Sequence, residues 1–158
     1  MHEGKIMQNF REILIQVYQK TNQFGIENHF ELLKFGPDEI RYKLEVKSKH
    51  LATPTTAHGG LIAGYMDGIL GLAALYESSK DANLVSTVEF KINYLKPARV
   101  GDILIGVGRT ISAGKRIIVT EGEVYNEKTN EKVAIATGTF NAYPYQKAGI
   151  GFSDISDL

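Results

Sequence analysis

The chain has 158 residues, 43% of them hydrophobic, and its 18 basic and 18 acidic side chains leave no formal net charge. This length is sufficient for one domain with a substantial core. The balanced, scattered charges argue against a broad electrostatic surface for nucleic acid or membranes, and the absence of cysteine excludes disulfides, thiol nucleophiles and thiolate metal sites.

An amphipathic helix is predicted near the N-terminus, where apolar residues recur at helical spacing and end between Thr21 and Gly25. Polar residues interrupt this segment, so it lacks the apolar core of a signal peptide. We therefore expect a soluble, cytoplasmic protein. The four histidines show no paired spacing, so no metal site is expected. The apolar positions of the helix are Ile6, Phe10, Ile13, Leu14 and Val17.

A β-hairpin is predicted next. Two strands, Phe30–Lys34 and Glu39–Val46, flank a turn at residues 35–38 whose Gly, Pro and Asp residues favour the required backbone angles. The second strand alternates apolar and charged residues, so we expect one face of it to be buried.

A buried helix is predicted from about Gly60 to Ser78, after a loop rich in threonine and proline and a His58-Gly59-Gly60 turn. Its apolar residues cover nearly the whole circumference, which indicates burial on all sides. Gly60, Gly64 and Gly68 recur every four residues, so we expect them to line one face that another backbone approaches closely.

Four strands are predicted after this helix because the hydrophobic period changes to two. Their short connections favour an antiparallel meander. The tail Gln146–Leu158 has little pattern and is expected to fray. The strands are residues 84–94, Ile103–Ile111, Arg116–Tyr125 and Lys132–Tyr143. We therefore predict one α+β domain over residues 1–158, with its core at about 26–145 and about six strands curled around a central helix.

Only two groups that titrate near neutral pH, His58 and Asp67, occur between Leu51 and Tyr76. A helix that begins at Gly59 or Gly60 presents unpaired N–H groups, which can polarise a carbonyl oxygen. Asp67 follows about two turns later, where it is a candidate general base or nucleophile. Together these groups suit acyl transfer to water.

Each of these residues also has a structural interpretation. Gly59 and Gly60 form a common tight turn, and an internal Asp67 can bond a tyrosine hydroxyl or a neighbouring loop. His58 is either an anchor for the turn or a general base. Thr87 either holds the attacking water or is an ordinary β-branched strand residue.

Lys115 and Arg116, at a hairpin turn, either meet nucleotide phosphates or are simply solvated.

These motifs resemble the hotdog-fold acyl-CoA thioesterases, in particular the phenylacetic-acid-degradation (PaaI-like) type. The resemblance covers about residues 50–142 and preserves the order and spacing of the elements. The segments that carry it are His58-Gly59-Gly60-Leu61, Asp67 nine residues after the histidine, Thr87–Ala98, Gly101-Asp102, Gly114-Lys115 and Ala136–Phe140.

The resemblance implies a central helix wrapped by a curved antiparallel sheet, preceded here by an extra N-terminal helix. It also implies homodimers or homotetramers with active sites at the dimer interface, Asp67 coming from one subunit and Thr87 from the other. The Gly59 N–H would polarise the thioester carbonyl and Gly60 would shape the start of the helix. Coenzyme A is then part of the substrate and product, not a cofactor, and Lys115 and Arg116 would lie near its phosphates.

One departure from the family pattern lies before the histidine. Family members often have Asn and Gly where this chain has Ala52 and Thr55, and a nearby threonine such as Thr55 is the candidate replacement in substrate binding. The principal hypothesis is hydrolysis of an acyl-CoA thioester. The alternative is a non-catalytic acyl-CoA or acyl-carrier binding protein of the same fold.

Overall fold

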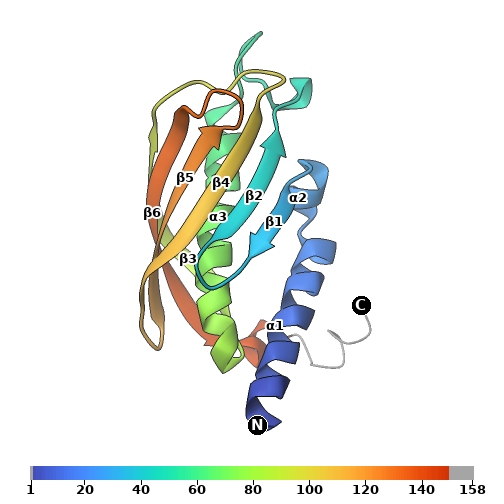
Figure 1. Cartoon of the computed structure of the whole chain (residues 1–158), viewed down its shortest axis with the longest axis vertical. Coiled ribbons are helices and arrows are strands. Elements are labelled where there is room, and N and C mark those ends of the chain that lie inside the picture. The colour runs from blue at the N-terminus through green and yellow to red at the C-terminus, as the bar shows by residue number, and fades with distance from the viewer. Residues whose placement is uncertain (1, 150–158) are drawn as a thin grey trace.

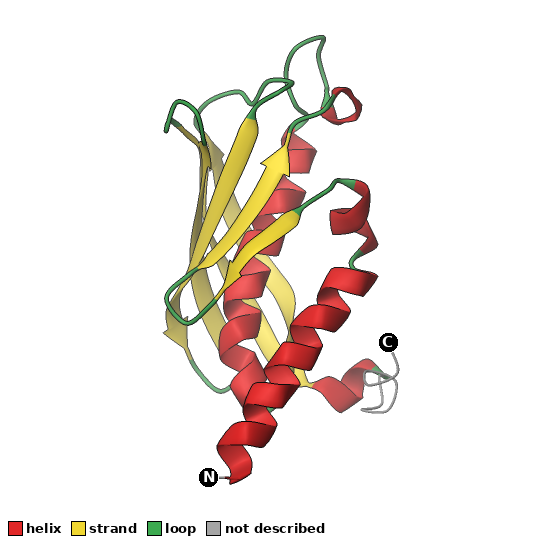
Figure 2. Cartoon of the chain, turned by 45° about the vertical axis from the view of Figure 1, so that its right-hand side comes forward, coloured by secondary structure: helices red, strands yellow, loops and turns green. Residues whose placement is uncertain are grey.

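Helix α3 (Gly59–Ser78) lies at the centre of the computed structural model, which describes residues 2–149 and side chains from residue 10 onward. A curved sheet covers one side of this helix, and an N-terminal helix lies along another (Figures 1 and 2). By length and composition Gly59–Asp81 is apolar enough to cross a membrane, but here it forms the core, and side chains such as Ile69 and Leu70 are fully buried. The predicted central helix is therefore confirmed to within one residue.

The sheet has six antiparallel strands in the order β1-β2-β4-β5-β6-β3. The predicted four-stranded meander is wrong in one respect, because β3 pairs with β6 and not with β4. The connection at 95–102 is too long for a tight hairpin and bonds to the loop before α3, with the Ala57 N–H donating to the Ala98 carbonyl. Strand β3 is consequently an edge of the sheet. The strands are β1 (Glu31–Phe35), β2 (Ile40–Glu45), β3 (Asn83–Tyr94), β4 (Ile103–Ala113), β5 (Ile117–Asn126) and β6 (Lys132–Pro144).

Glycines of the sheet allow the close contact between sheet and helix. A Cβ on Gly108 would lie 2.7 Å from the Ile69 carbonyl oxygen, nearer than side chains tolerate. The prediction that helix glycines receive another backbone is wrong, because Gly64 and Gly68 face the aromatic rings of Phe24 and Tyr42. The close approach of helix and sheet backbones occurs instead where strand glycines such as Gly106 and Gly108 face Ile69 of α3.

The N-terminal segment forms two helices, where the sequence predicted one. Helix α1 (His2–Thr21) ends before Asn22, whose side chain accepts a hydrogen bond from the Gly25 N–H and begins helix α2 (Gln23–Glu27). Phe10 and Leu14 of α1 are buried in the same core as α3. The central helix, curved six-stranded sheet and N-terminal helix of the predicted hotdog fold are therefore confirmed.

Three short 3-10 helices complete the described chain, namely η1 (Ser48–His50), η2 (Ser79–Asp81) and η3 (Tyr145–Ala148). The last corrects the beginning of the predicted frayed tail, because residues 146–148 are helical and the Tyr145 ring packs against Phe10 at 5.3 Å between centroids. The remainder of that prediction, residues 150–158, lies outside the described residues.

Candidate functional site

His58 caps the N-terminus of α3. Its backbone is extended, and its Nδ1 accepts a hydrogen bond from the Gly60 N–H at 2.7 Å. This bond uses one of the free donors at the start of the helix. Among the described residues, the Gly59 N–H has no partner. The geometry favours the interpretation of His58 as the anchor of the turn.

Tyr94, at the end of β3, supports the same turn. Its hydroxyl donates to the Gly59 carbonyl at 2.9 Å, and its ring lies 3.6 Å from the position of a Cβ on Gly59. The sequence analysis did not single out this residue. Tyr94 is 53% exposed although it belongs to the apolar side of the strand pattern, and that pattern gave no signal of its contact with Gly59.

Asp67 and Thr87 are brought together within one chain. The Thr87 hydroxyl donates to Asp67 Oδ1 at 2.8 Å, and the Asp67 side chain is half-buried. The expectation that these two residues come from different subunits is therefore wrong. A β-bulge between Thr87 and Glu89 interrupts the alternation of β3. The alternation predicted Thr87 on the polar face, but its hydroxyl contacts Asp67 of α3.

Gly59 and Asp67 are too far apart to act on one carbonyl group in the same chain. They are separated by eight residues of one helix, which is about 12 Å at roughly 1.5 Å per residue. Direct hydrogen bonds span only about 3 Å. The predicted arrangement, in which both groups of one chain face the same thioester, is therefore not formed by a single copy.

Lys115 and Arg116 lie at the far end of the sheet from Gly59. They occupy the turn between β4 and β5. Tyr94, which contacts Gly59, lies at the other end, because it pairs with Ala134 of β6, which in turn pairs with Val124 of β5. Eight residues separate Arg116 from Val124, which is about 26 Å at roughly 3.3 Å per residue. Thr87 lies nearer to the end with Lys115 and Arg116, because it pairs with Phe140 of β6, which in turn pairs with Ile118 of β5.

The loop at 52–57 holds the two departures from the family pattern. Thr55 is exposed and its carbonyl accepts from the Val100 N–H, while the Ala52 N–H donates to the Thr56 carbonyl. The loop is organised by the Thr53 hydroxyl, which accepts from the Thr56 N–H at 3.0 Å. The loop thus has its own internal bonds in place of an asparagine amide.

An apolar pocket of about 320 Å³ lies beside the Asp67–Thr87 pair. Helix α1, helix α3 and strands β3 and β6 all contribute to its walls, which are mostly aliphatic or aromatic. Besides Asp67 and Thr87, the lining residues are Leu14, Val17, Tyr18, Thr21, Gly68, Gly71, Leu72, Leu75, Leu84, Val85, Phe140 and Tyr143.

Two tyrosines lie beside Gly68, next to Asp67 in the helix. The half-buried Tyr18 lines the pocket, and the buried Tyr42 lies behind it. Burial raises the pKa of Tyr18 and of Tyr42, so both hydroxyls are neutral at physiological pH. The Asn22 amide donates to the Tyr18 hydroxyl at 2.9 Å. The Tyr18 hydroxyl therefore gives the pocket a neutral polar group near the carboxylate.

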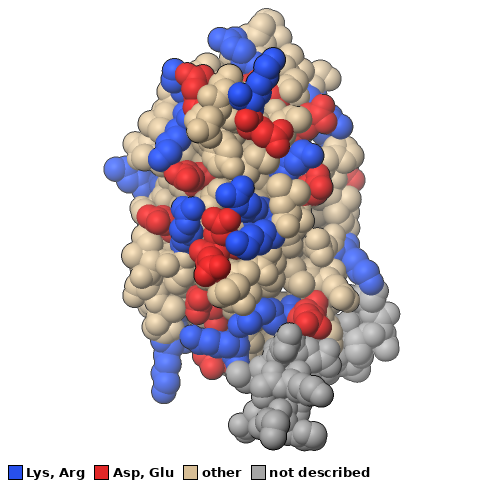
Figure 3. All heavy atoms as spheres, viewed as in Figure 1, with Lys and Arg blue, Asp and Glu red and all other residues tan. Residues whose placement is uncertain are grey.

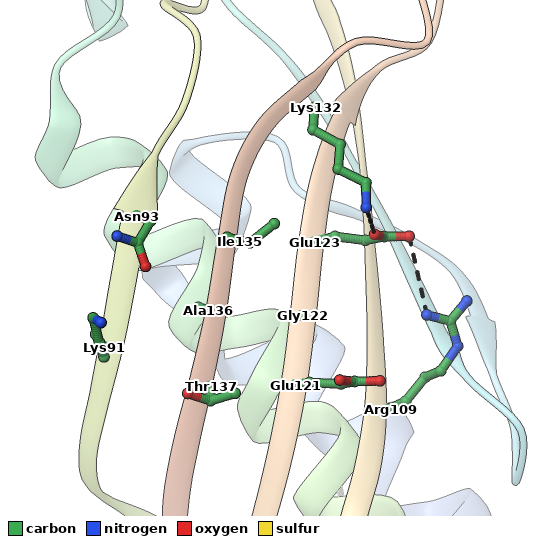
Figure 4. Close-up of a pocket in the computed structure, with 10 residues that line it drawn as sticks. All are labelled: Lys91, Asn93, Arg109, Glu121, Gly122, Glu123, Lys132, Ile135, Ala136 and Thr137. Atoms are coloured by element: carbon green, nitrogen blue, oxygen red, sulfur yellow. Dashed lines mark ion pairs between the residues drawn. The ribbon is translucent and has the colours of Figure 1, made fainter.

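A second cavity, of about 340 Å³, opens on the outer face of the sheet and is lined by charged residues (Figure 4). Glu123 projects between two cations, with Lys132 at 2.9 Å and Arg109 at 4.0 Å. The lining has three cations, Lys91, Arg109 and Lys132, and two carboxylates, Glu121 and Glu123, so the cavity has only a small net positive charge for attracting a phosphate. The visible face of the molecule likewise intersperses basic and acidic side chains (Figure 3).

No group of three or more His, Asp or Glu side chains within the described part of the chain is arranged to hold a metal ion. The candidate chemical groups of the site are the carboxylate of Asp67, the hydroxyl of Thr87 and the backbone N–H of Gly59.

Comparison with known proteins shows the family to which the chain belongs. A family described as the thioesterase superfamily matches residues 55–133. The chain is similar to human acyl-coenzyme A thioesterase 13, with 26% identity over 127 residues that cover 80% of this chain and 89% of the relative.

Two solved structures have the same architecture. A Streptococcus mutans protein solved bound to acetyl CoA is 31% identical, with a TM-score of 0.65, covering 73% of this chain and 89% of that one. The PaaI protein of the phenylacetic acid degradation operon of E. coli has a TM-score of 0.75 at 16% identity, covering 82% and 90%, and supports the fold alone.

Proposed function

The chain belongs to the thioesterase superfamily, and from this premise we propose that it hydrolyses acyl-CoA thioesters in a site completed by two copies of the chain. The observation that carries the proposal is the hydrogen-bonded Asp67–Thr87 pair beside an apolar pocket. The name of the human relative and the acetyl CoA bound to the Streptococcus protein support CoA as the carrier of the acyl group.

Asp67 acts as the general base in this proposal. The Thr87 hydroxyl donates to one carboxylate oxygen and so orients the carboxylate. A water molecule that donates to Asp67 attacks the thioester carbon while the carboxylate accepts its proton. The C–S bond then breaks, the thiolate of CoA takes up that proton, and the free acid remains.

The oxyanion formed on attack needs a donor, and the partner's Gly59 supplies it in this proposal. Strand β3 is a sheet edge of 12 residues, and its Val88 is 59% exposed. Exposed edges of this kind pair readily with a second strand. Antiparallel pairing of two β3 strands, centred between Phe90 and Lys91, would set the partner's Tyr94 opposite Thr87, and the partner's Gly59 with it.

The same arrangement keeps the other proposed contacts within reach. The partner's Gly60 shapes the turn beside the carbonyl, and the partner's Thr55 lies in the loop before it. Lys115 and Arg116 belong to the end of the sheet that carries Thr87, so we assign them to the phosphates of CoA. CoA is thus part of the acyl-CoA substrate and one of the two products.

Thiol release from a panel of acyl-CoAs tests the proposal. We expect the wild type to release CoA and Asp67→Asn to lose at least a hundredfold in kcat, since general-base catalysis contributes about 10²–10⁴. Asp81→Asn, an exposed acid beyond the end of the same helix, is the matched control and is expected to keep wild-type activity. Tight CoA binding without thiol release from any acyl-CoA would instead identify the non-catalytic binding protein.

A further inference from the structure

Helix α1 forms one whole wall of the apolar pocket. Residues Leu14, Val17, Tyr18 and Thr21 lie on one face of this helix and line the cavity opposite α3. The two helices are antiparallel, since Tyr18 lies near Gly68 whereas Arg11 contacts η2 just after α3. The pocket therefore runs from Asp67 toward the C-terminal end of α3.

Side-chain contacts hold this wall at both ends, since the Tyr18 hydroxyl also hydrogen-bonds Tyr42. The Arg11 guanidinium donates to the Ser79 hydroxyl at 2.8 Å and to the Tyr76 carbonyl at 3.1 Å, and it lies 4.0 Å from the centre of the Tyr76 ring. Among the described residues, no strand forms a backbone ladder with α1. Its position over the pocket thus depends on side chains.

We propose that α1 is the specificity wall of an acyl-binding pocket, and that this pocket accepts medium-chain acyl groups of roughly eight to twelve carbons. The inference rests on the proposed thioesterase function and identifies its substrate class. Asp67 stands at one end of the pocket, where the thioester reacts, and Leu75 and Leu84 belong to the other end. Val17 lies between the two ends on the α1 side.

Two measures of the pocket give this chain length. From Asp67 to Leu75 is eight helical residues, or about 12 Å, and zigzag C–C bonds of about 1.5 Å advance about 1.25 Å each, which allows nine or ten carbons. The volume is about 320 Å³. A dry cavity of about 150 Å³ binds benzene, so by ratio this pocket holds roughly twelve carbons at most.

The decisive experiment measures kcat/KM for butyryl-CoA and decanoyl-CoA in the wild type and Val17→Phe. Each methylene excluded from the pocket lowers kcat/KM about fourfold, so exclusion of three lowers the decanoyl value about sixtyfold. Butyryl-CoA is expected to lose much less than decanoyl-CoA because its four carbons fill only the part of the pocket next to Asp67, so the new ring displaces less of its chain. Gln16→Phe, exposed on the other side of α1, is the matched control and should leave both values unchanged.

Leu84→Phe narrows the same pocket from strand β3. It shows whether an effect of Val17→Phe comes from the narrowed pocket or from a disturbed α1. It is expected to impair decanoyl-CoA and spare butyryl-CoA in the same way. Equal losses for both chain lengths, or no difference between Val17→Phe and Gln16→Phe, would overturn the inference. A change in the number of subunits in Val17→Phe, measured by light scattering, would also overturn the inference. It would mean that a second copy of the chain, and not an acyl group, occupies the pocket.

A failure of the underlying function gives a different result. If the wild type released no thiol from either substrate, calorimetric binding of decanoic acid would still test the pocket directly. Binding by the wild type that is lost in Val17→Phe and kept in Gln16→Phe would support the pocket. Equal binding by all three proteins, or by none, would contradict it.

Discussion

Replacing Gly59 with proline removes the one backbone N–H that the proposed mechanism requires, and the fold should tolerate the change. Gly59 is the first residue of α3, where proline is favoured because the N–H has no partner within the helix. The residue before it, His58, has φ −64 and ψ 134, which is the extended backbone that a following proline needs. The variant therefore isolates a single hydrogen-bond donor.

Loss of one oxyanion donor lowers kcat by about 10²–10³, equivalent to about 2.7–4 kcal/mol. We expect Gly59→Pro to show this loss with a small change in melting temperature. Gly59→Ala is the control, because it keeps the N–H and its Cβ would lie 3.6 Å from the Tyr94 ring, an ordinary contact. Thiol release gives kcat, and thermal unfolding reports the fold. A folded Gly59→Pro enzyme with kcat within about threefold of Gly59→Ala would refute the assignment.

Three further predictions concern single residues. Thr87→Val should lower kcat about tenfold to a hundredfold because a hydrogen bond to a charged group contributes about 1.5–3 kcal/mol, whereas Thr87→Ser should retain most activity in the same assay. His50 is buried, its Nδ1 accepts from the Lys47 N–H, and burial lowers its pKa, so it folds as the neutral form. Because the unfolded chain binds the proton more readily, its contribution to stability should be complete above about pH 6.5 and decline below that value, and urea unfolding of the wild type should show a steeper loss on acidification than His50→Phe does. Gly108→Ala should destabilise the fold by about 1–3 kcal/mol or more in urea unfolding, since the new Cβ meets the α3 backbone, while Gly36→Ala, with only ordinary contacts, should not.

The sequence was informative wherever the signal was local. The His58 cap, the all-round apolar pattern of α3 and the alternation along the strands depend on nearest neighbours, and these elements were predicted with boundaries close to those observed. Asp67 was identified for the same reason, because one carboxylate in a long apolar segment is conspicuous without any structure.

The features that were missed depend on contacts between distant segments. Neither strand periodicity nor connection length shows that β3 pairs with β6. This pairing places Asn93 beside Ile135 and not beside β4. The bulge after Thr87 shifts the alternation by one residue, and this shift accompanies the contact with Asp67. An amphipathic pattern buries one face of α1, but the pattern does not say that part of this face borders a cavity.

Subunit complementation tests the two-copy site most directly. Gly59→Pro and Asp67→Asn are each expected to be inactive alone, and they are unfolded together and refolded as a mixture. If the Gly59 N–H of one copy serves Asp67 of the other, half of the dimers are mixed and each has one intact site, so the account predicts recovery of about a quarter of wild-type kcat. If both groups act within one chain, every subunit carries a defect, and a mixture no more active than its components would contradict the account.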